Sequence, residues 1–597
     1  MATNLTDRQI LRKTATNRGE TVDLIIRNAT IVDGTGAAAR AGDLGVSDGR
    51  ITDVAGPGSL DATGATRVID AEGLVVCPGF VDPHTHYDAQ LFWDPSASPS
   101  NVHGVTSVIA GNCGFTLAPV CDGDGAYTAA MLARVEGMPL PALELGLDWQ
   151  WNSMAEYLDR LDGNLGVNAG FLVGHCAIRR TVMGADAVGQ EATPDQVARM
   201  KELLAESLSA GGLGFSTTRA RTHSDGDDEP VASRWATEDE VIALAEVVAQ
   251  HEGTTLEFAS DGCLDGFEDA EVDFMIRFSR AGQRPLNWNV LTVDSHAPER
   301  YRNQLAAMDR CSAEGARVVA LTMPVIVPMN MSFLNFCALN LMPDWGDILS
   351  LPLPERMERL RDPGTRRFMQ ERAASPDAGV FARLTGWATY VIGDTFSAEN
   401  EGLSGRKVED IAAERGDANP FDTLVDIVLA DELRTILWPG ATDNDSESWE
   451  LRRQAWDHPS VMLGGSDAGA HLDRMQGAGY PTRFLGDCIR GRKLVPMERA
   501  VQLMTQVPAE LFGLTDRGVI AEGAHADLVL FDPEQIDSEM LTLVEDLPGG
   551  CKRLHAGSVG VKHVFVSGTE TVTDGEPTGE LPGSVIRSGR DTSTVTI

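Results

Sequence analysis

Basic residues are scarce in this chain of 597 residues. There are 49 lysines and arginines against 88 aspartates and glutamates, so the net charge at neutral pH is −39. A chain this acidic is repelled by phosphate backbones and by anionic lipid surfaces. The composition therefore argues against nucleic acid or a membrane as a partner, and solubility in a crowded or salty cytoplasm is the simplest explanation of the charge.

Signals for disulfides, export and membrane insertion are also missing. The nine cysteines are scattered without a Cys-x-x-Cys pair, which predicts a reducing compartment, the cytoplasm. Met1 to Glu20 is polar and lacks the apolar region of a signal peptide. The longest strongly apolar stretch, Val318 to Met329, is shorter than the roughly 20 residues of a spanning helix and contains two prolines. We expect a soluble protein.

Short β-rich runs with turn dipeptides occupy both ends of the chain. Val22 to Val76 contains Asp33-Gly34 and Asp48-Gly49, which are typical of hairpin turns. The pattern returns between Ala526 and Gly575. We expect the two ends to pair into one small β-sandwich that brackets everything between them.

Eight apolar, β-rich runs lie between these ends, and most are followed by helical periodicity. Thr193 to Gln196 and Thr237 to Glu240 fit capping boxes, which mark helix starts. Eight β-then-α units predict a (β/α)₈ TIM barrel, an α/β fold of about 250 residues with its chemistry at the carboxyl ends of the strands. The runs are Phe80 to His86, Val105 to Cys113, Val167 to His175, Gly212 to Thr217, Thr254 to Phe258, Pro285 to Leu291, Ala316 to Leu321 and Val461 to Asp467.

The connection between the seventh and eighth runs, about Pro324 to Pro459, is far longer than the two to six residues usual for such loops. It predicts an inserted helical subdomain. The expected division is 1–77 and 516–597 for the β-sandwich, 78–323 for barrel strands one to seven, 324–458 for the insertion, and 459–515 for strand eight and the last helix.

The polar residues that end these strands include the donor types that zinc accepts. His84 and His86 lie two apart in an extended segment, so both side chains are expected on one face. A chance His-x-His and an ordinary buried thiol at Cys113 are the simpler alternatives. The strand-end candidates are His84, His86, Cys113, His175, Glu257, Asn289 and Asp467.

Taken together, the motifs resemble the amidohydrolase superfamily, and within it the N-acyl-D-amino-acid deacylase (D-aminoacylase) branch. The resemblance extends over nearly the whole chain from about Val22. The motifs that carry it are Pro78-Gly79-Phe80-Val81-Asp82-Pro83-His84-Thr85-His86, Gly111-Asn112-Cys113-Gly114, Arg134-Val135-Glu136-Gly137, Val173 to Arg179, Gly214-Phe215-Ser216 and Gly465-Ser466-Asp467-Ala468.

This resemblance implies a metal-dependent hydrolase of an amide C–N bond in a small-molecule substrate. It implies one or two divalent ions, of which zinc is the expected metal, held by His84, His86, Cys113 and Asp467, with Asp467 also the general base. It also suggests a homo-oligomer. We further expect His175, Arg179, Asn289 and His471 to contact substrate, whereas His223, beside an Asp-rich loop, is expected to be solvated.

The chain departs from that branch at two metal positions. Strands five and six, where the branch has histidines, offer Glu257 and Asn289. Glu257 is either a substitute ligand or a structural, salt-bridged glutamate. The departure keeps two alternatives open besides an N-acyl-D-amino acid deacylase: a cyclic amide or imide hydrolase, and a non-catalytic binding protein on the amidohydrolase fold.

Overall fold

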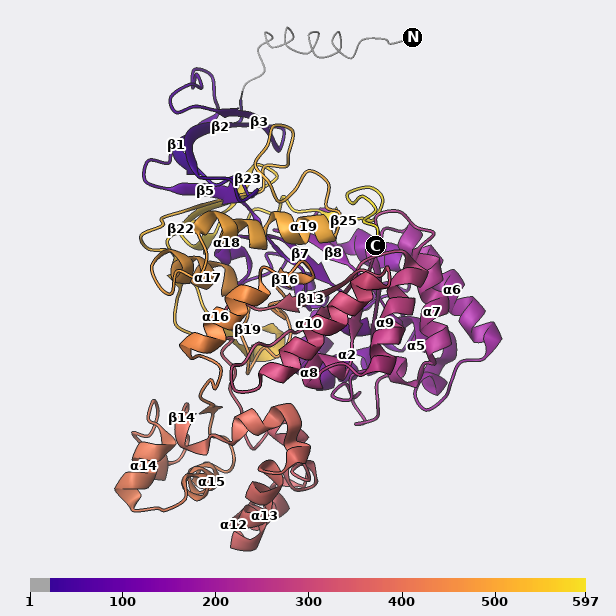
Figure 1. The fold of residues 1–597 in the computed structure, drawn as a ribbon, viewed down its shortest axis with the longest axis vertical. Coiled ribbons are helices and arrows are strands. Elements are labelled where there is room, and N and C mark those ends of the chain that lie inside the picture. The colour runs from indigo at the N-terminus through magenta and orange to yellow at the C-terminus, as the bar shows by residue number, and fades with distance from the viewer. Residues whose placement is uncertain (1–21) are drawn as a thin grey trace.

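A computed structural model describes residues 22–597 (Figure 1). The polar leader and the first residues of the predicted N-terminal β segment, 1–21, lie outside the described residues. Three regions follow one another from top to bottom in Figure 1: a sheet that includes β1, β2 and β3, an α/β core, and a helical body that contains α12 to α15.

Strands from both chain ends form one nine-stranded sheet. β5 pairs antiparallel with β17, so that Val76 lies opposite Leu530, although the two residues are far apart in sequence. The sheet contains β1 (Leu24–Ile31), β2 (Arg40–Ser47), β3 (Arg50–Ala55), β4 (Arg67–Asp70), β5 (Val75–Pro78), β17 (Leu528–Phe531), β22 (Val561–Val566), β23 (Thr569–Thr573) and β24 (Glu576–Pro577). The two ends therefore meet in a single continuous sheet.

The core of the molecule holds two parallel sheets. One contains β6 (Phe80–Asp82), β7 (Val105–Ala110), β8 (Asn168–Phe171) and β25 (Val585–Ile586). The other contains β9 (Val173–Gly174), β10 (Gly214–Thr218), β11 (Thr255–Ala259), β12 (Leu286–Asn289), β13 (Val318–Thr322) and β16 (Val461–Leu463). β7 and β10 to β11 are buried at every residue, as expected for parallel strands covered on both faces.

The two parallel sheets are linked at two places. Leu172 alone separates β8 from β9, so the chain passes directly from one sheet to the other. Beyond the ends of β6 and β16, Thr85 and Ala468 form a parallel bridge, and the His86 amide donates to the Ala468 carbonyl at 2.7 Å. The segments that follow β6 and β16 therefore lie next to each other.

Helices connect most of the core strands. The helices are α2 (Gly125–Val135), α3 (Leu140–Gly146), α4 (Met154–Leu161), α5 (His175–Met183), α6 (Pro194–Ser209), α7 (Glu238–Val248), α8 (Gly262–Asp265), α9 (Asp269–Gly282), α10 (Pro298–Ala313), α11 (Gly346–Leu349), α12 (Leu353–Arg361), α13 (Pro363–Ala373), α14 (Val408–Arg415), α15 (Pro420–Ala430), α16 (Ser446–Ala455), α17 (Tyr480–Ile489), α18 (Met497–Met504) and α19 (Gln506–Leu511). Within the described part of the chain, none combines the length and apolar character needed to cross a bilayer.

The capping signals behave differently at their two helices. Thr193 and Gln196 form both hydrogen bonds of a capping box at the start of α6. At α7, Thr237 accepts from the Glu240 amide, but the Glu240 side chain turns inward to His175 and Arg179. The second capping box is therefore only half formed, because a buried arginine competes for its carboxylate.

The segment between β13 and β16 contains a body with its own hydrophobic core. That core includes Trp345, Trp387 and Phe421 and extends from Met331 to Leu437. The short pair β14 (Val391–Ile392) and β15 (Leu437–Trp438) lies at its boundary. Trp449 and Ala455 of α16 pack instead into the main core. The hydrophobic core of this body therefore spans residues 331 to 437.

Two further strand pairs lie in the C-terminal part of the chain. They are β18 (Asp537–Ser538) with β21 (Ser558–Val559), and β19 (Thr542–Leu547) with β20 (Cys551–His555).

Candidate metal centre

His84 and His86 follow β6 and are both buried. Thr85, between them, faces the opposite way and donates its hydroxyl to the Ile109 carbonyl at 2.9 Å. Asp82 accepts from the Ser466 amide at 3.3 Å, which ties this segment to the loop after β16. The alternation of an extended segment thus places both imidazoles on the same side, as the spacing predicts.

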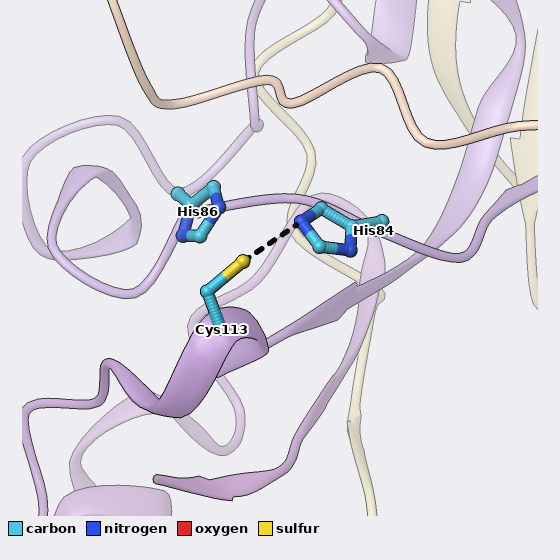
Figure 2. Close-up of side chains that lie close together, drawn as sticks. All are labelled: His84, His86 and Cys113. Carbon is cyan, nitrogen blue, oxygen red and sulfur yellow. Dashed lines mark hydrogen bonds between the residues drawn. The ribbon is translucent and has the colours of Figure 1, made fainter. Parts of the chain in front are cut away.

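Cys113 lies in a tight turn after β7, within the 3₁₀ helix η3 (Asn112–Gly114), with a left-handed φ of 55°. Gly111 has a φ of 76°, and a Cβ there would lie 2.4 Å from the Leu172 carbonyl oxygen, so the turn requires glycine. The turn directs the Cys113 sulfur towards His84, 3.7 Å from its Nε2 atom (Figure 2). Figure 2 also shows His86 beside this pair.

Asp467 reaches the same point from the loop after β16. Its backbone is left-handed, with φ 60°, and its amide donates to the His84 carbonyl at 3.1 Å. One carboxylate oxygen lies 3.1 Å from His86 Nε2 and 3.7 Å from His84 Nε2. The structure therefore brings together the four residues for which the resemblance implies metal binding.

Glu136 is a fifth member of this cluster that the strand-end argument missed. Its carboxylate is buried and lies 3.7 Å from His86 Nε2 and 3.9 Å from His471 Nε2. The residue follows a helix, α2, and a search of strand ends therefore passes over it. The available signal was the Arg134-Val135-Glu136-Gly137 motif.

His471 and His223 complete the surroundings. His471 Nε2 lies 3.7 Å from Asp467 Oδ2, so this histidine is at the site as expected. His223, which was expected to be solvated, is only partly exposed. Its Nδ1 bonds the Thr218 hydroxyl at 2.7 Å, its ring packs against Phe115, and burial and the charge of His86 lower its pKa to about 3.

Glu257 and Asn289 occupy the positions at which the chain departs from the branch. Glu257 is buried and accepts from the Cys113 amide at 2.8 Å, with its other oxygen 4.0 Å from the Cys113 sulfur. It is thus tied to the cysteine turn, and a salt bridge does not explain its position. The Asn289 amide nitrogen lies 3.3 Å from His84 Nε2.

His175 and Arg179 are not at the site. Both side chains are fully buried and contact Glu240: His175 Nε2 at 2.9 Å, and Arg179 Nη1 at 2.6 Å from each carboxylate oxygen. Because both side chains are fully buried against Glu240, a substrate cannot reach them. We therefore correct the expected substrate contacts of His175 and Arg179 to a structural ion-pair cluster.

Two buried carboxylates of the site, Glu136 and Glu257, have raised pKa values, and so does His86 beside them. Burial raises the pKa of Glu136 to about 7 and that of Glu257 to about 8. Burial lowers the pKa of His84 to about 3. Burial also acts to lower the pKa of His86, but Glu136 and Asp467 outweigh it and raise the value to about 10. A bound cation would supply the charge that these carboxylates otherwise draw onto His86.

The donor spacing also fits a cation. Donors bound tetrahedrally to one zinc ion at about 2.0–2.3 Å are about 3.3–3.7 Å apart. The distances from His84 Nε2 to Cys113 Sγ and to Asp467 Oδ1 are both 3.7 Å, and His86 Nε2 lies 3.1 Å from the same oxygen. Two groups of three residues each have their ligand atoms within 4.8 Å of one another. One group is His84, His86 and Cys113, and the other is His86, Glu136 and Asp467.

A cavity of about 930 Å³ opens beside Asp467. One wall is the apolar segment Met323 to Met329, which follows β13, and another is Trp438 to Asn444, which follows the helical body. Arg483 and Arg492 lie in the lining. Pockets of this size bind ligands larger than a simple amino acid.

Comparison with known proteins identifies the family. The model of the amidohydrolase family matches residues 67–577. An uncharacterised protein of Mycobacterium tuberculosis (strain ATCC 25618 / H37Rv) is 31% identical over 96% of this chain and 95% of its own length. The N-acyl-D-glutamate deacylase of Alcaligenes xylosoxydans xylosoxydans is 29% identical over 96% of this chain and 98% of its own.

A solved structure extends this likeness. It is the N-acyl-D-glutamate deacylase of Bordetella bronchiseptica, complexed with zinc and a phosphonate mimic of the tetrahedral intermediate. It is 26% identical, covers 95% of this chain and 100% of its own, and has a TM-score of 0.62. The chain belongs to the amidohydrolase family, in its D-aminoacylase branch.

Proposed function

We propose that the protein is a metal-dependent hydrolase that removes the acyl group from an N-acyl-D-amino acid or a related N-acyl compound. The observation that carries the proposal is a pair of donor groups beside the cavity that share His86: one with His84 and Cys113, the other with Glu136 and Asp467. Relatives matched over almost their whole length are deacylases of N-acyl-D-amino acids, which supports this substrate class.

Each step of an amide hydrolysis can be attributed to a residue of the site. His84, His86, Cys113 and Asp467 would hold a divalent cation, most simply zinc. When bound, such a cation polarises an amide carbonyl and lowers the pKa of an attacking water. Asp467 accepts a proton from the water as the water oxygen attacks the acyl carbon. Asp467 then delivers this proton to the amide nitrogen as the C–N bond breaks. The products are a carboxylic acid and a free amine.

The pKa of Asp467 leaves its carboxylate in the ionised form that a proton acceptor requires. Burial acts to raise this pKa, but the hydrogen bond and charge of His86 outweigh it and keep the pKa well below its usual range. Asp467 is therefore ionised at neutral pH. Its side chain is also partly exposed to the cavity, so a substrate amide can approach it.

The cavity supports a substrate with one bulky apolar arm. Met323, Val325, Ile326 and Met329 are only partly buried and line it on the side of β13. An N-acetyl group alone would leave most of this wall facing water, at a cost of about 25 cal/mol for each Å² of apolar surface that a longer arm could cover.

The alternatives are supported less well. The departure at Glu257 and Asn289 keeps a cyclic amide or imide hydrolase as the second candidate. A non-catalytic binding protein would have no physical need for two overlapping groups of metal donors and a buried excess of carboxylates.

Finer features of the organisation are also proposals. We infer that the two parallel sheets form one closed (β/α)₈ barrel, supported by the Thr85–Ala468 bridge and by the passage from β8 to β9. We propose the division 1–77, 78–323, 324–458, 459–515 and 516–597, with the chain-end sheet curled as a β-sandwich. Nine free cysteines support a cytoplasmic location. A homo-oligomer stays a prediction.

Two measurements test the function together. Metal content per chain, determined by elemental mass spectrometry on protein purified without chelator, should be at least one equivalent. A panel of N-acetyl, N-octanoyl and N-phenylacetyl derivatives of D- and L-amino acids, with hydantoins, should show release of free amine from D-derivatives. Absence of both metal uptake and amine release would favour the binding protein, and ring opening of hydantoins alone would favour the second candidate.

A further inference from the structure

Two carboxylates, the buried Glu136 and the partly exposed Asp467, face His86 from different parts of the chain. Asp467 comes from the loop after β16, and Glu136 follows α2. Their oxygens lie 3.1 and 3.7 Å from the same imidazole atom, Nε2. Both distances lie near the spacing of donors that share one cation, about 3.3–3.6 Å for oxygen and nitrogen ligands.

The direction of approach separates Glu136 from a supporting residue. A carboxylate that merely orients a metal-bound histidine bonds the ring nitrogen that does not bind the metal. Glu136 instead lies at Nε2, the atom that also faces Asp467. It is therefore on the coordinating side of the imidazole.

The backbone fixes Glu136 in this place. Its amide donates to the Leu132 carbonyl at 2.9 Å, which continues α2, and its carbonyl accepts from the His471 amide at 2.5 Å. Gly137 follows with a φ of 59°, and a Cβ there would lie 3.1 Å from His471 Nδ1. The helix end and the loop after β16 thus hold each other, and the carboxylate between them is buried.

Glu257 provides the contrast within the same site. It too is buried, but it accepts from the Cys113 amide and lies on the cysteine side of the cluster. It does not belong to either group of convergent donors, whereas Glu136 forms one with His86 and Asp467.

We propose that Glu136 is a ligand of the cation, which it shares with His86 and Asp467. This inference rests on the proposed function, because it assumes that a divalent cation binds at this site. It adds a carboxylate from outside the strand ends to the donor set and gives the Arg134 to Gly137 motif a chemical role.

The test compares Glu136→Gln with Glu257→Gln and with Glu144→Gln, an exposed residue on the neighbouring helix α3. Each full-length variant is freed of metal and titrated with Co²⁺, and affinity and visible absorption are recorded with circular dichroism as the check of folding. We expect Glu136→Gln to bind Co²⁺ at least 100-fold more weakly and with an altered spectrum. Glu257→Gln should stay within about tenfold of the wild type, and Glu144→Gln should match it.

Should Glu136→Gln not fold, Glu136→Asp keeps the charge but withdraws it by one methylene, and it should still weaken Co²⁺ binding and change the spectrum. Wild-type affinity and spectrum in the Glu136 variants would overturn the inference, including when only the pH profile of turnover changes. A wild-type protein that binds no cation would instead remove the proposed function itself. The two failures are therefore distinct.

Discussion

Replacement of Arg179 by methionine tests its reassignment from substrate contact to structural ion pair. The guanidinium is fully buried, contacts both oxygens of Glu240 at 2.6 Å, and donates to the Gln190 carbonyl at 2.7 Å. Methionine fills similar space but leaves Glu240 charged and buried without its cation. Removal of one partner of such a pair costs about 3–5 kcal/mol of unfolding free energy.

A surface pair provides the matched control. Arg199 contacts Glu202 at 2.9 Å, but both side chains are more than half exposed. Water screens such a pair, so Arg199→Met should cost less than about 1 kcal/mol. The contrast between the two variants, followed by urea unfolding and by differential scanning fluorimetry, isolates the effect of burial.

The pH dependence supplies a second readout. Burial alone would raise the pKa of Glu240. The hydrogen bonds and positive charges of His175 and Arg179 outweigh burial, so the pKa is lowered from its ordinary value of 4.5. A lowered pKa stabilises the folded state above the ordinary value and loses that effect as pH falls through the folded value. The unfolding free energy that Glu240→Gln loses relative to the wild type should therefore be largest above pH 4.5 and should decrease in more acidic solution.

The double variant completes the argument. Arg179→Met combined with Glu240→Gln removes the orphaned charge and should recover at least half of the loss caused by Arg179→Met alone. If Arg179→Met were as stable as Arg199→Met but raised KM for an N-acyl substrate, the structural reassignment would be refuted.

Two further predictions concern the chemistry and the helical body. Asp467→Asn should keep the fold and lower kcat by about 10²–10⁴ because the amide cannot accept the proton; steady-state release of amine measures this, and unchanged turnover would exclude Asp467 as the base. Trp345→Ala removes a fully buried ring whose Nε1 donates to the Met369 carbonyl at 2.8 Å. It should cost the body around Trp345 about 3–5 kcal/mol. Limited proteolysis should then cut first between residues 331 and 437, and first cuts in the parallel sheets would contradict the independence of that body's core.

The local sequence pattern predicts much of this fold, because each core strand is an apolar run that ends at a small or polar residue. Four site residues can be predicted as candidates in this way. His84 and His86 are two apart in an extended segment, and Cys113 and Asp467 each follow an apolar run. The pairing of β5 with β17 follows a similar logic, since both ends carry β-rich runs that need a partner.

The remainder depends on contacts between distant segments, which local patterns do not contain. Glu136 follows a helix, and at the site its backbone is bound by His471, which is distant in sequence. Glu240 satisfies the capping pattern of α7, yet its side chain is recruited by Arg179 on another helix. His223 neighbours an acidic loop in sequence but packs against Phe115 in space.

The bridge between Thr85 and Ala468 has a consequence for how the protein is made. The ribosome must synthesise more than three quarters of the chain before His84 and Asp467 exist together, because they are 383 residues apart. At about 5–20 residues per second, the histidines wait roughly 20–80 s for the aspartate. During that interval the nascent chain carries the two imidazoles and the thiol without Asp467. The complete set of donors, with Asp467, therefore forms only in the last third of synthesis.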